Sequence, residues 1–273
     1  MKKNELNSVW INELTWKDID RYLEDKQIVI VPVGSTEQHG PGGPLGLDSY
    51  VAKALAQDAA KKTGVLVTPP LWFGDSSHHL DFPGTVSLST NTLIEVIKDI
   101  VRSLSRNGFK KILLINGHKS ANLAALETAC KTVHEDELKD TMLAIADPMN
   151  ISKGITSIKD TIEHHAGELE ISQVWYKYPE LIKEDELEGT EHIDLKKDLS
   201  PFTKEDLLGK NDETISVIWN SHEEKKMVPN GSFSDSTKAS REKGKKYHDY
   251  MVDILVDFID WMKDNESVVG KLG

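Results

Sequence analysis

Short apolar runs alternate with amphipathic stretches through the first half of the chain. Continuous runs rich in Val, Ile and Leu are typical of parallel strands that are buried on both faces. Their alternation with stretches of helical periodicity indicates β-α units around a parallel sheet, and therefore a three-layer α/β domain. The expected strands are Gln27–Val33, Val65–Pro69, Lys111–Ile115 and Thr141–Ala146, and the expected helices are about Asp48–Lys62, Asn91–Asn107 and Ser120–His134.

The second half of the chain has a less regular pattern. A further helix is predicted from Glu163 to Pro179, followed by a polar surface excursion over about 180–210. Thr214–Trp219 and a segment ending near Phe233 are expected to pair as late strands. A final helix over about Thr237–Lys263 carries an apolar stripe that we assign to the core. No linker divides the chain, so residues 1–273 are interpreted as one domain.

Composition limits the class of protein and the kind of site. With 38% apolar and 29% charged residues over 273 positions, the chain is an ordinary globular mixture rather than a disordered or collagen-like one. A single cysteine, Cys130, cannot form an internal disulfide or a Cys-rich zinc site, so any metal must be bound by His and carboxylates. We expect a cytoplasmic protein, and the apolar runs are too short to predict a membrane association.

The charge balance bears on possible partners. The chain has 33 Lys and Arg against 45 Asp and Glu, which gives a net charge of 33 − 45 = −12. Contacts with phosphates dominate the affinity of proteins for nucleic acids, and they require basic surfaces. Because no stripe of Lys and Arg interleaved with aromatic residues occurs, we expect no nucleic-acid partner.

The segment from Gly34 to Asp48, directly after the first predicted strand, concentrates unusual residues. Ligands of open α/β sheets bind at the carboxyl ends of the strands, where this segment lies. Glu37 and His39 are two residues apart, so in an extended segment both side chains point the same way and can reach one ion. Asp48 opens the next helix, where it could ligate the same ion. The alternative is that Asp48 caps the helix and that the other two are ordinary loop residues.

Three further histidine motifs follow along the chain. His118 lies after the strand over Lys111–Ile115, at the same predicted edge of the sheet as Glu37. His165 and Glu168 have the i, i+3 spacing that places two side chains on one helix face. His79 lies in a segment that could line the pocket. Each of these residues has a structural alternative, either as a hydrogen-bonded loop residue or as an acidic residue near a helix N-terminus.

Taken together, these motifs bring histidines and carboxylates to one rim of the sheet. Imidazole and carboxylate ligands suit zinc, iron or manganese, so a hydrolytic centre with one or two divalent ions is predicted. No G-x-G-x-x-G or P-loop motif occurs in the chain. A serine hydrolase is less favoured because Ser35 does not lie in a G-x-S-x-G elbow.

Four ordered motifs resemble those of the creatininase family of metal-dependent amidohydrolases, which includes formamide-opening enzymes. They are VPVGSTEQHGPGGPLGLD, HLDFPGT, INGHKSAN and HHAGELE. The resemblance runs from about Ile28 to Tyr176, and the segment Ser232–Gly244 is similar to the C-terminal part of the family. It implies a doubly wound, mainly parallel sheet, a binuclear metal site and a homo-oligomer, often a hexamer.

The resemblance also implies a role for each matched residue. Glu37 and His118 would bind one metal, His39 would bind the other, and Asp48 would bridge the two. His165 would deliver a proton to the leaving group after an activated water has attacked a carbonyl-like carbon.

The outer carboxylate of creatininase proper lies two residues after the histidine of the NGH motif. Here that position is Ser120, which cannot replace a carboxylate, so Glu168 is the expected ligand instead.

Departures from the family motifs leave the substrate open. The His, Leu and Thr of the usual loop are replaced here by Gly42, Gly43 and Leu47. Directly after the NGH motif the chain has Lys119. We expect a small-molecule substrate contacted by His79, Lys119 and Ser120. The predicted reaction is hydrolysis of a small cyclic amide or formamide with two divalent ions, Zn, Mn or Fe. The alternatives are ring opening of a keto-cyclitol or keto-sugar, and a non-catalytic metal-binding scaffold.

Overall fold

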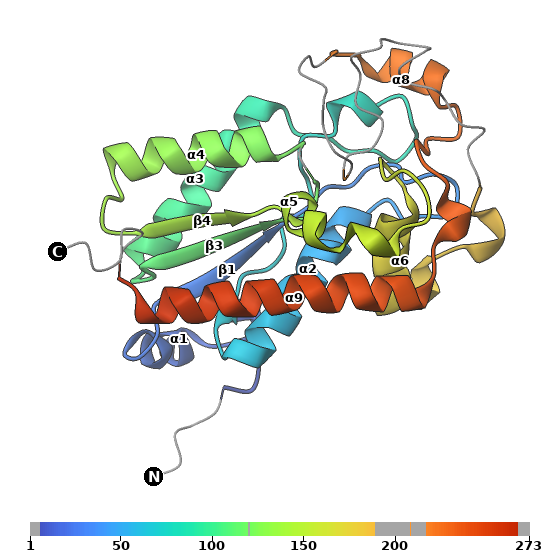
Figure 1. Ribbon diagram of the computed structural model, residues 1–273. Helices are drawn as coiled ribbons and strands as arrows, with labels where there is room; N and C mark the ends of the chain where they lie inside the picture. Colours follow the sequence, from blue (N-terminus) through green and yellow to red (C-terminus); the bar gives the residue numbers. More distant parts are fainter. Residues whose placement is uncertain (1–5, 120, 189–207, 209–216, 267–273) are drawn as a thin grey trace.

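The structure is a computed structural model that describes residues 6–119, 121–188, 208 and 217–266. Its centre is a parallel sheet of four strands in the order β2-β1-β3-β4, with helices on both faces (Figure 1). All four predicted strands are confirmed, although β2 is shorter than predicted. The strands are β1 (Ile28–Val33), β2 (Leu66–Val67), β3 (Lys111–Asn116) and β4 (Met142–Ala146).

The helices predicted between the strands are present, with bounds within three residues of those expected. The α-helices in the described residues are α1 (Trp16–Leu23), α2 (Leu47–Thr63), α3 (Thr90–Arg106), α4 (Leu123–Asp136), α5 (Pro148–Ser152), α6 (Glu168–Lys177), α8 (Ser221–Met227) and α9 (Arg241–Asp264). Short 3-10 helices cover Ile11–Glu13, Ser77–His79, Lys153–Ile158, Pro179–Leu181, Glu184–Glu186 and Ser236–Lys238.

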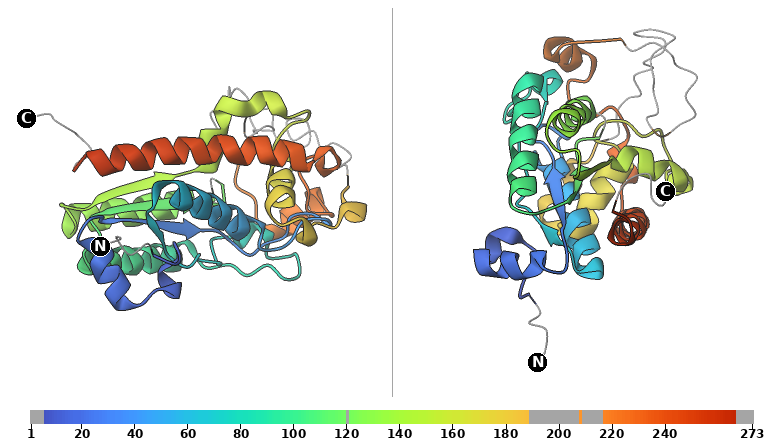
Figure 2. Two further views of the ribbon diagram at one scale, coloured as in Figure 1. Left: turned by 90° about the horizontal axis from the view of Figure 1, so that it is seen from below. Right: turned by 90° about the vertical axis from the view of Figure 1, so that its left-hand side faces the viewer.

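Alternate residues of the central strands face opposite layers, as expected for a sheet that is buried on both sides. Ile28 and Ile30 of β1 pack in one core with residues of α2, α6 and α9. Val29 and Val31 pack in the other core with residues of α1, α3 and α4. Figure 2 shows the two helical layers on either side of the sheet. The predicted three-layer α/β architecture is therefore confirmed.

The apolar stripe of the final helix lies in the core, as predicted. Tyr247, Met251 and Leu255 of α9 are buried, and the helix runs along one face of the sheet (Figure 1). Ile254 of the same helix is 40% exposed. The helix begins at Arg241 rather than near Thr237, because Ser240 caps it by accepting a hydrogen bond from the amide of Lys243.

The strand order places a topological switch point between β1 and β3. From β1 the chain crosses through α2 to β2 on one side and then returns through α3 to β3 on the other side. The loops that follow β1 and β3 therefore leave the sheet in opposite directions at its carboxyl edge. Such switch points are where ligands bind in open α/β sheets.

Two predictions for the second half are wrong. Helix α6 begins at Glu168, not at Glu163, because Ala166 adopts a left-handed conformation (φ 56°) that a right-handed helix cannot contain. The late strand pair is also absent from the described residues, where 217–220 has no regular structure and α8 follows. Asn220 starts α8 through a capping box with Glu223. Residues 214–216 of the predicted pair lie outside the described residues.

The predicted surface excursion is described over its residues 180–188 and at Leu208, which is buried in the core. Its residues 180–188 form short 3-10 turns, and the amide of Lys183 donates a hydrogen bond to the carbonyl of Gly42. This segment therefore packs on the loop after β1. In the part of the chain that the structure describes, no helix combines the length and apolar composition needed to cross a membrane.

The contact between α6 and α9 leads to a testable prediction. A Cβ added at Gly244 of α9 would overlap the backbone carbonyl of Ser172 in α6, so the two helices can approach only with glycine at this position. We expect Gly244→Ala to lower the free energy of unfolding by about 1–3 kcal/mol, the usual cost of overpacking. Denaturant unfolding measures this change. Asp257→Ala, at an exposed position of the same helix, is the control, and equal stability of the two variants would contradict the packing argument.

Candidate metal centre

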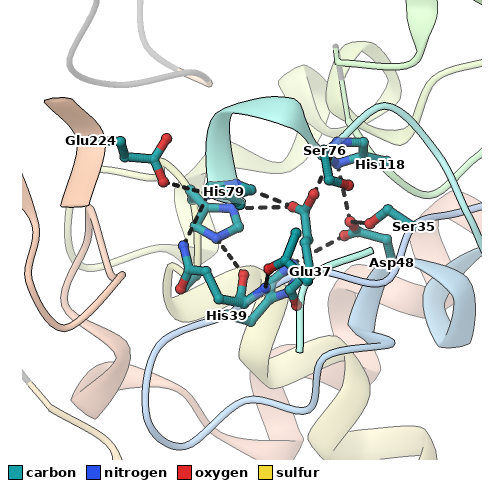
Figure 3. Close-up of polar contacts among 12 residues, drawn as sticks. Ser35, Glu37, His39, Asp48, Ser76, His79, His118 and Glu224 are labelled. Carbon is teal, nitrogen blue, oxygen red and sulfur yellow. Dashed lines mark hydrogen bonds and ion pairs between the residues drawn. The ribbon is translucent and has the colours of Figure 1, made fainter. Parts of the chain in front are cut away.

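The predicted ligand residues converge at the carboxyl edge of the sheet. Glu37 and His39 come from the loop after β1, and Asp48 lies in the first turn of α2. His118 follows β3 in a tight turn. Figure 3 shows the carboxylate of Glu37 between His118 and His79. Segments that are far apart in sequence therefore supply one cluster of imidazoles and carboxylates.

Glu37 is at the centre of this cluster and is fully buried. Its carboxylate oxygens lie 3.1 Å from His118 Nε2 and 3.4 Å from His79 Nε2. Neither oxygen accepts a hydrogen bond of good geometry from any described residue. Burying this charge costs free energy that no such hydrogen bond offsets, so the carboxylate needs a cation next to it.

Asp48 is the second buried carboxylate. Its Oδ1 lies 3.2 Å from His39 Nε2, and its Oδ2 lies 3.1 Å from His118 Nδ1. The hydroxyl of Ser35 also donates a hydrogen bond to Oδ2. Asp48 therefore contacts both histidines of the predicted metal set.

The turn that carries His118 is held against the start of α2. A Cβ added at Gly117 would overlap the backbone carbonyl of Asp48, so glycine allows the backbone of the turn to touch that of the helix. This contact fixes the distance between the imidazole of His118 and the carboxylate of Asp48.

The cluster shifts the pKa values of its members. Burial alone would raise the pKa of Glu37, but the positive charges of His118 and His79 lower it to about 2. Burial also opposes ionisation of Asp48, yet His39 and His118 hold its pKa well below the usual range. Conversely, Glu37 and Asp48 raise the pKa of His118 to about 9, against the effect of burial. In the metal-free chain the imidazoles thus carry the positive charge that the two carboxylates require.

His165 lies in the loop before α6, which several hydrogen bonds hold in place. The amide of Ala166 donates to Glu170 Oε2 at 2.8 Å, and the hydroxyl of Ser232 donates to the carbonyl of Ala166. The amide of Phe233 donates to the carbonyl of His165. These bonds offset the left-handed conformation of Ala166, which typically costs about 1–2 kcal/mol. His165 is therefore held in a defined position beside the cluster.

The hydrogen bonding of His165 fixes its tautomer. Its Nε2 lies 2.8 Å from the carbonyl oxygen of Gln38, and a carbonyl can only accept, so Nε2 carries the proton. Its Nδ1 lies 3.7 Å from Glu37 Oε1. Burial, together with the positive charges of His79 and His39, holds the pKa of His165 well below its usual value. A neutral imidazole thus points an unprotonated nitrogen at the cluster.

Glu168 is not brought to the cluster, although the sequence predicts it to be a ligand. Its Oε2 accepts a hydrogen bond from Lys243 Nζ at 2.9 Å. Its Oε1 accepts from the backbone amides of Asp160 and Thr161. Because these partners already engage both oxygens, Glu168 anchors the start of α6 to α9.

The residues predicted to contact the substrate are placed differently from one another. His79 lies in the cluster, where Glu37 and Glu224 raise its pKa to about 10 against the effect of burial. Lys119 is buried, with Nζ 3.1 Å from Glu170 Oε1, so its ammonium pairs with a protein carboxylate. Ser120 lies outside the described residues.

Sequence reasoning missed Glu224. It is fully buried in α8, where its carboxylate accepts from His79 Nδ1 and, at 3.3 Å, from Trp219 Nε1. No local motif marks this residue, since α8 was not predicted and His79 is 145 residues away.

The donor set suits a divalent cation. Within the described part of the chain, three groups of three residues place one ligand atom each within 4.8 Å of one another, and Glu37 belongs to all three. Imidazole and carboxylate donors are those expected for Zn²⁺, Mn²⁺ or Fe²⁺. The orphaned oxygens of Glu37 are the independent observation that the residues fit a metal. The groups are Glu37–Asp48–His118, Glu37–His39–His165 and Glu37–His78–His79.

Three known proteins match parts of this chain in sequence. A 3-dehydro-scyllo-inosose hydrolase of Thermotoga maritima is 37% identical over 111 residues, which cover 40% of this chain and 36% of that protein. A creatinine amidohydrolase of Pseudomonas putida is 29% identical over 195 residues, or 65% of this chain and 75% of that protein. A mycofactocin precursor peptide peptidase of Mycolicibacterium smegmatis is 41% identical over 108 residues, or 37% of this chain and 43% of that protein.

The fold and the family assignment extend over most of the chain. A crystal structure of creatinine amidohydrolase matches with a TM-score of 0.75 at 24% identity, covering 94% of this chain and 98% of that one. The sequence model of the family described as creatinine amidohydrolase matches residues 12–259. The chain therefore belongs to the creatininase family of metal-dependent hydrolases.

Proposed function

We propose that this protein uses two divalent ions to hydrolyse a C–N bond of a small cyclic amide or formamide. The observation that carries the proposal is the buried carboxylate of Glu37, which has imidazoles around it and accepts no hydrogen bond of good geometry from any described residue. In this proposal Glu37 and His118 would hold one ion, His39 would hold the other, and Asp48 would be a ligand of both. Glu168 is left out of the ligand set because Lys243 and two backbone amides engage its carboxylate.

His165 is the proposed catalytic residue for proton transfer. Bound ions would lower the pKa of a water nucleophile and polarise the substrate carbonyl. The unprotonated Nδ1 of His165 faces the cluster and can take up the proton of the attacking water. The same nitrogen then delivers that proton to the leaving nitrogen as the C–N bond breaks. The hydrogen bond from Nε2 to Gln38 keeps the ring oriented through both transfers.

Relatives support the choice of metal and the class of substrate. Solved structures that match at 24% identity include a manganese form of creatininase and a variant described as Zn–Zn type. We therefore propose Zn or Mn ahead of Fe. We also propose a small-molecule substrate, a cytoplasmic location and a homo-oligomer. The family resemblance suggests that this oligomer is a hexamer.

A second candidate is ring opening of a keto-cyclitol. The match to the Thermotoga maritima inosose hydrolase, at 37% identity over 111 residues, favours it. The same metal cluster would serve this reaction, since a ketone carbonyl is also polarised by a divalent ion.

The metal proposal is tested by two substitutions with opposite expected effects. Asp48→Ala should remove both ions, because it deletes the bridging ligand. His165→Ala should keep the metal content of the wild type and lower turnover by about 10²–10⁴-fold, the usual contribution of a general acid or base. Elemental analysis of the purified proteins measures the bound metal, and Asp136→Ala at an exposed position is the control. Equal metal content in Asp48→Ala and wild type would rule out the bridging role.

The substrate class is tested by a screen of the metal-loaded enzyme. Small cyclic amides, formamides and keto-cyclitols are assayed with and without chelator, and turnover of an amide that chelator abolishes is expected. Turnover of keto-cyclitols alone would support the second candidate instead. A protein that binds two ions yet turns over none of these compounds would support the scaffold alternative.

A further inference from the structure

His79 presents one ring nitrogen to the metal cluster. Its Nε2 lies 3.4 Å from Glu37 Oε1 but makes no hydrogen bond of good geometry with any described residue. The side chain is 1% exposed, so solvent does not satisfy this nitrogen. An orphaned, buried imidazole nitrogen facing an orphaned carboxylate oxygen is the arrangement that a shared cation would satisfy.

The other ring nitrogen of His79 is held by Glu224. Nδ1 donates a hydrogen bond to Glu224 Oε1 (Figure 3). Gln38 Nε2 lies 3.2 Å from the same nitrogen. When Nδ1 carries the proton, Nε2 is the free nitrogen of the neutral ring. Metal-binding histidines usually donate their other nitrogen to a carboxylate in this way, which orients the ring and raises its basicity.

Helix α8 is fixed to the segment that carries His79. Ser221 donates a hydrogen bond to Asp81 at 2.7 Å, and the ammonium of Lys225 lies 3.8 Å from the ring centre of Phe82. Trp219 Nε1 binds the second oxygen of Glu224. The buried carboxylate of Glu224 is thus brought to the cluster by contacts outside it, as expected for a residue that orients a ligand.

The ligand set proposed above leaves room for His79. Glu168 is committed to α6 and α9, and serine at position 120 cannot supply a carboxylate. His79 is also one of the three residues in a group whose ligand atoms lie within 4.8 Å of one another, together with Glu37 and His78.

We propose that His79 binds a divalent ion of the cluster through Nε2 and that Glu224 is the positioning residue that orients it. This inference rests on the proposed metal-dependent function. It makes His79 a metal ligand rather than a substrate contact, and it gives α8 a part in metal affinity. The ligand is a first-row divalent ion, for which Zn²⁺ and Co²⁺ are suitable probes.

Metal titration of chelator-stripped full-length protein tests this inference. Calorimetry with Zn²⁺ gives the number of sites and their affinities, and the visible spectrum of Co²⁺ reports changes in the ligand set. His79→Ala should abolish one of the two sites, or weaken it at least 100-fold, and should alter the Co²⁺ spectrum. Glu224→Gln should keep both sites and weaken one of them by about 10–100-fold, the effect typical of losing an outer partner of a ligand.

Matched controls separate metal binding from folding. His134→Ala and Glu135→Gln change the same residue types on α4, away from the cluster, and should bind Zn²⁺ as the wild type does. If His79→Ala fails to fold, His79→Gln takes its place, since its amide can still donate to Glu224. A structural role alone would lower the melting temperature of the stripped variants while leaving their Zn²⁺ affinities unchanged.

The outcomes distinguish this inference from the proposed function. Wild-type protein that binds two ions, with unchanged affinities in His79→Ala or His79→Gln and in Glu224→Gln, would overturn the role of His79 and leave the hydrolase proposal standing. Wild-type protein that binds fewer than one ion per chain would overturn the metal-dependent function itself.

Discussion

Glu37 is a buried carboxylate that accepts no hydrogen bond of good geometry from the residues that the structure describes, so its charge must be neutralised by positive charge. The imidazoles nearest to it come from separate segments of the chain. His118 follows β3, His79 ends a 3-10 helix, and His165 precedes α6. Much of the irregular structure at this edge of the sheet can be understood as the means of holding these rings around one carboxylate.

The fold supplies this arrangement through close backbone contacts. In the order β2-β1-β3-β4, the loops after the neighbouring strands β1 and β3 leave the sheet in opposite directions, which is the topology at which open α/β sheets bind ligands. Gly117 then allows the turn after β3 to touch the first turn of α2, next to Asp48. Further from the sheet, hydrogen bonds to Ala166 stabilise a left-handed residue that turns His165 toward the site. Backbone geometry therefore sets the positions of the site residues at the edge of the sheet, and the attraction between imidazoles and carboxylates stabilises them there.

The sequence predicted the parts of this structure that depend on local pattern. Apolar runs located β1 and β3, and the motifs after them located Glu37 and His118 at one edge, because strand ends meet there. Features that depend on distant contacts were not predictable. Glu224 reaches His79 across 145 residues.

Two other residues show the same limit. Glu168 has the spacing of a helix-face partner of His165, but the left-handed residue between them separates the two side chains. Lys119 follows His118 directly, yet it points to Glu170 in the core. Periodicity and motif spacing cannot specify such pairings, since they are decided by tertiary packing.

The position of a bound ion relative to Glu37 decides whether this carboxylate is a metal ligand. Anomalous X-ray diffraction at the zinc or manganese absorption edge, on crystals of metal-loaded protein, would locate it. We expect an anomalous peak about 2.0–2.2 Å from a carboxylate oxygen of Glu37, the usual length of a metal–oxygen bond. Loaded crystals with no anomalous peak in contact with Glu37 would show that Glu37 does not bind the metal.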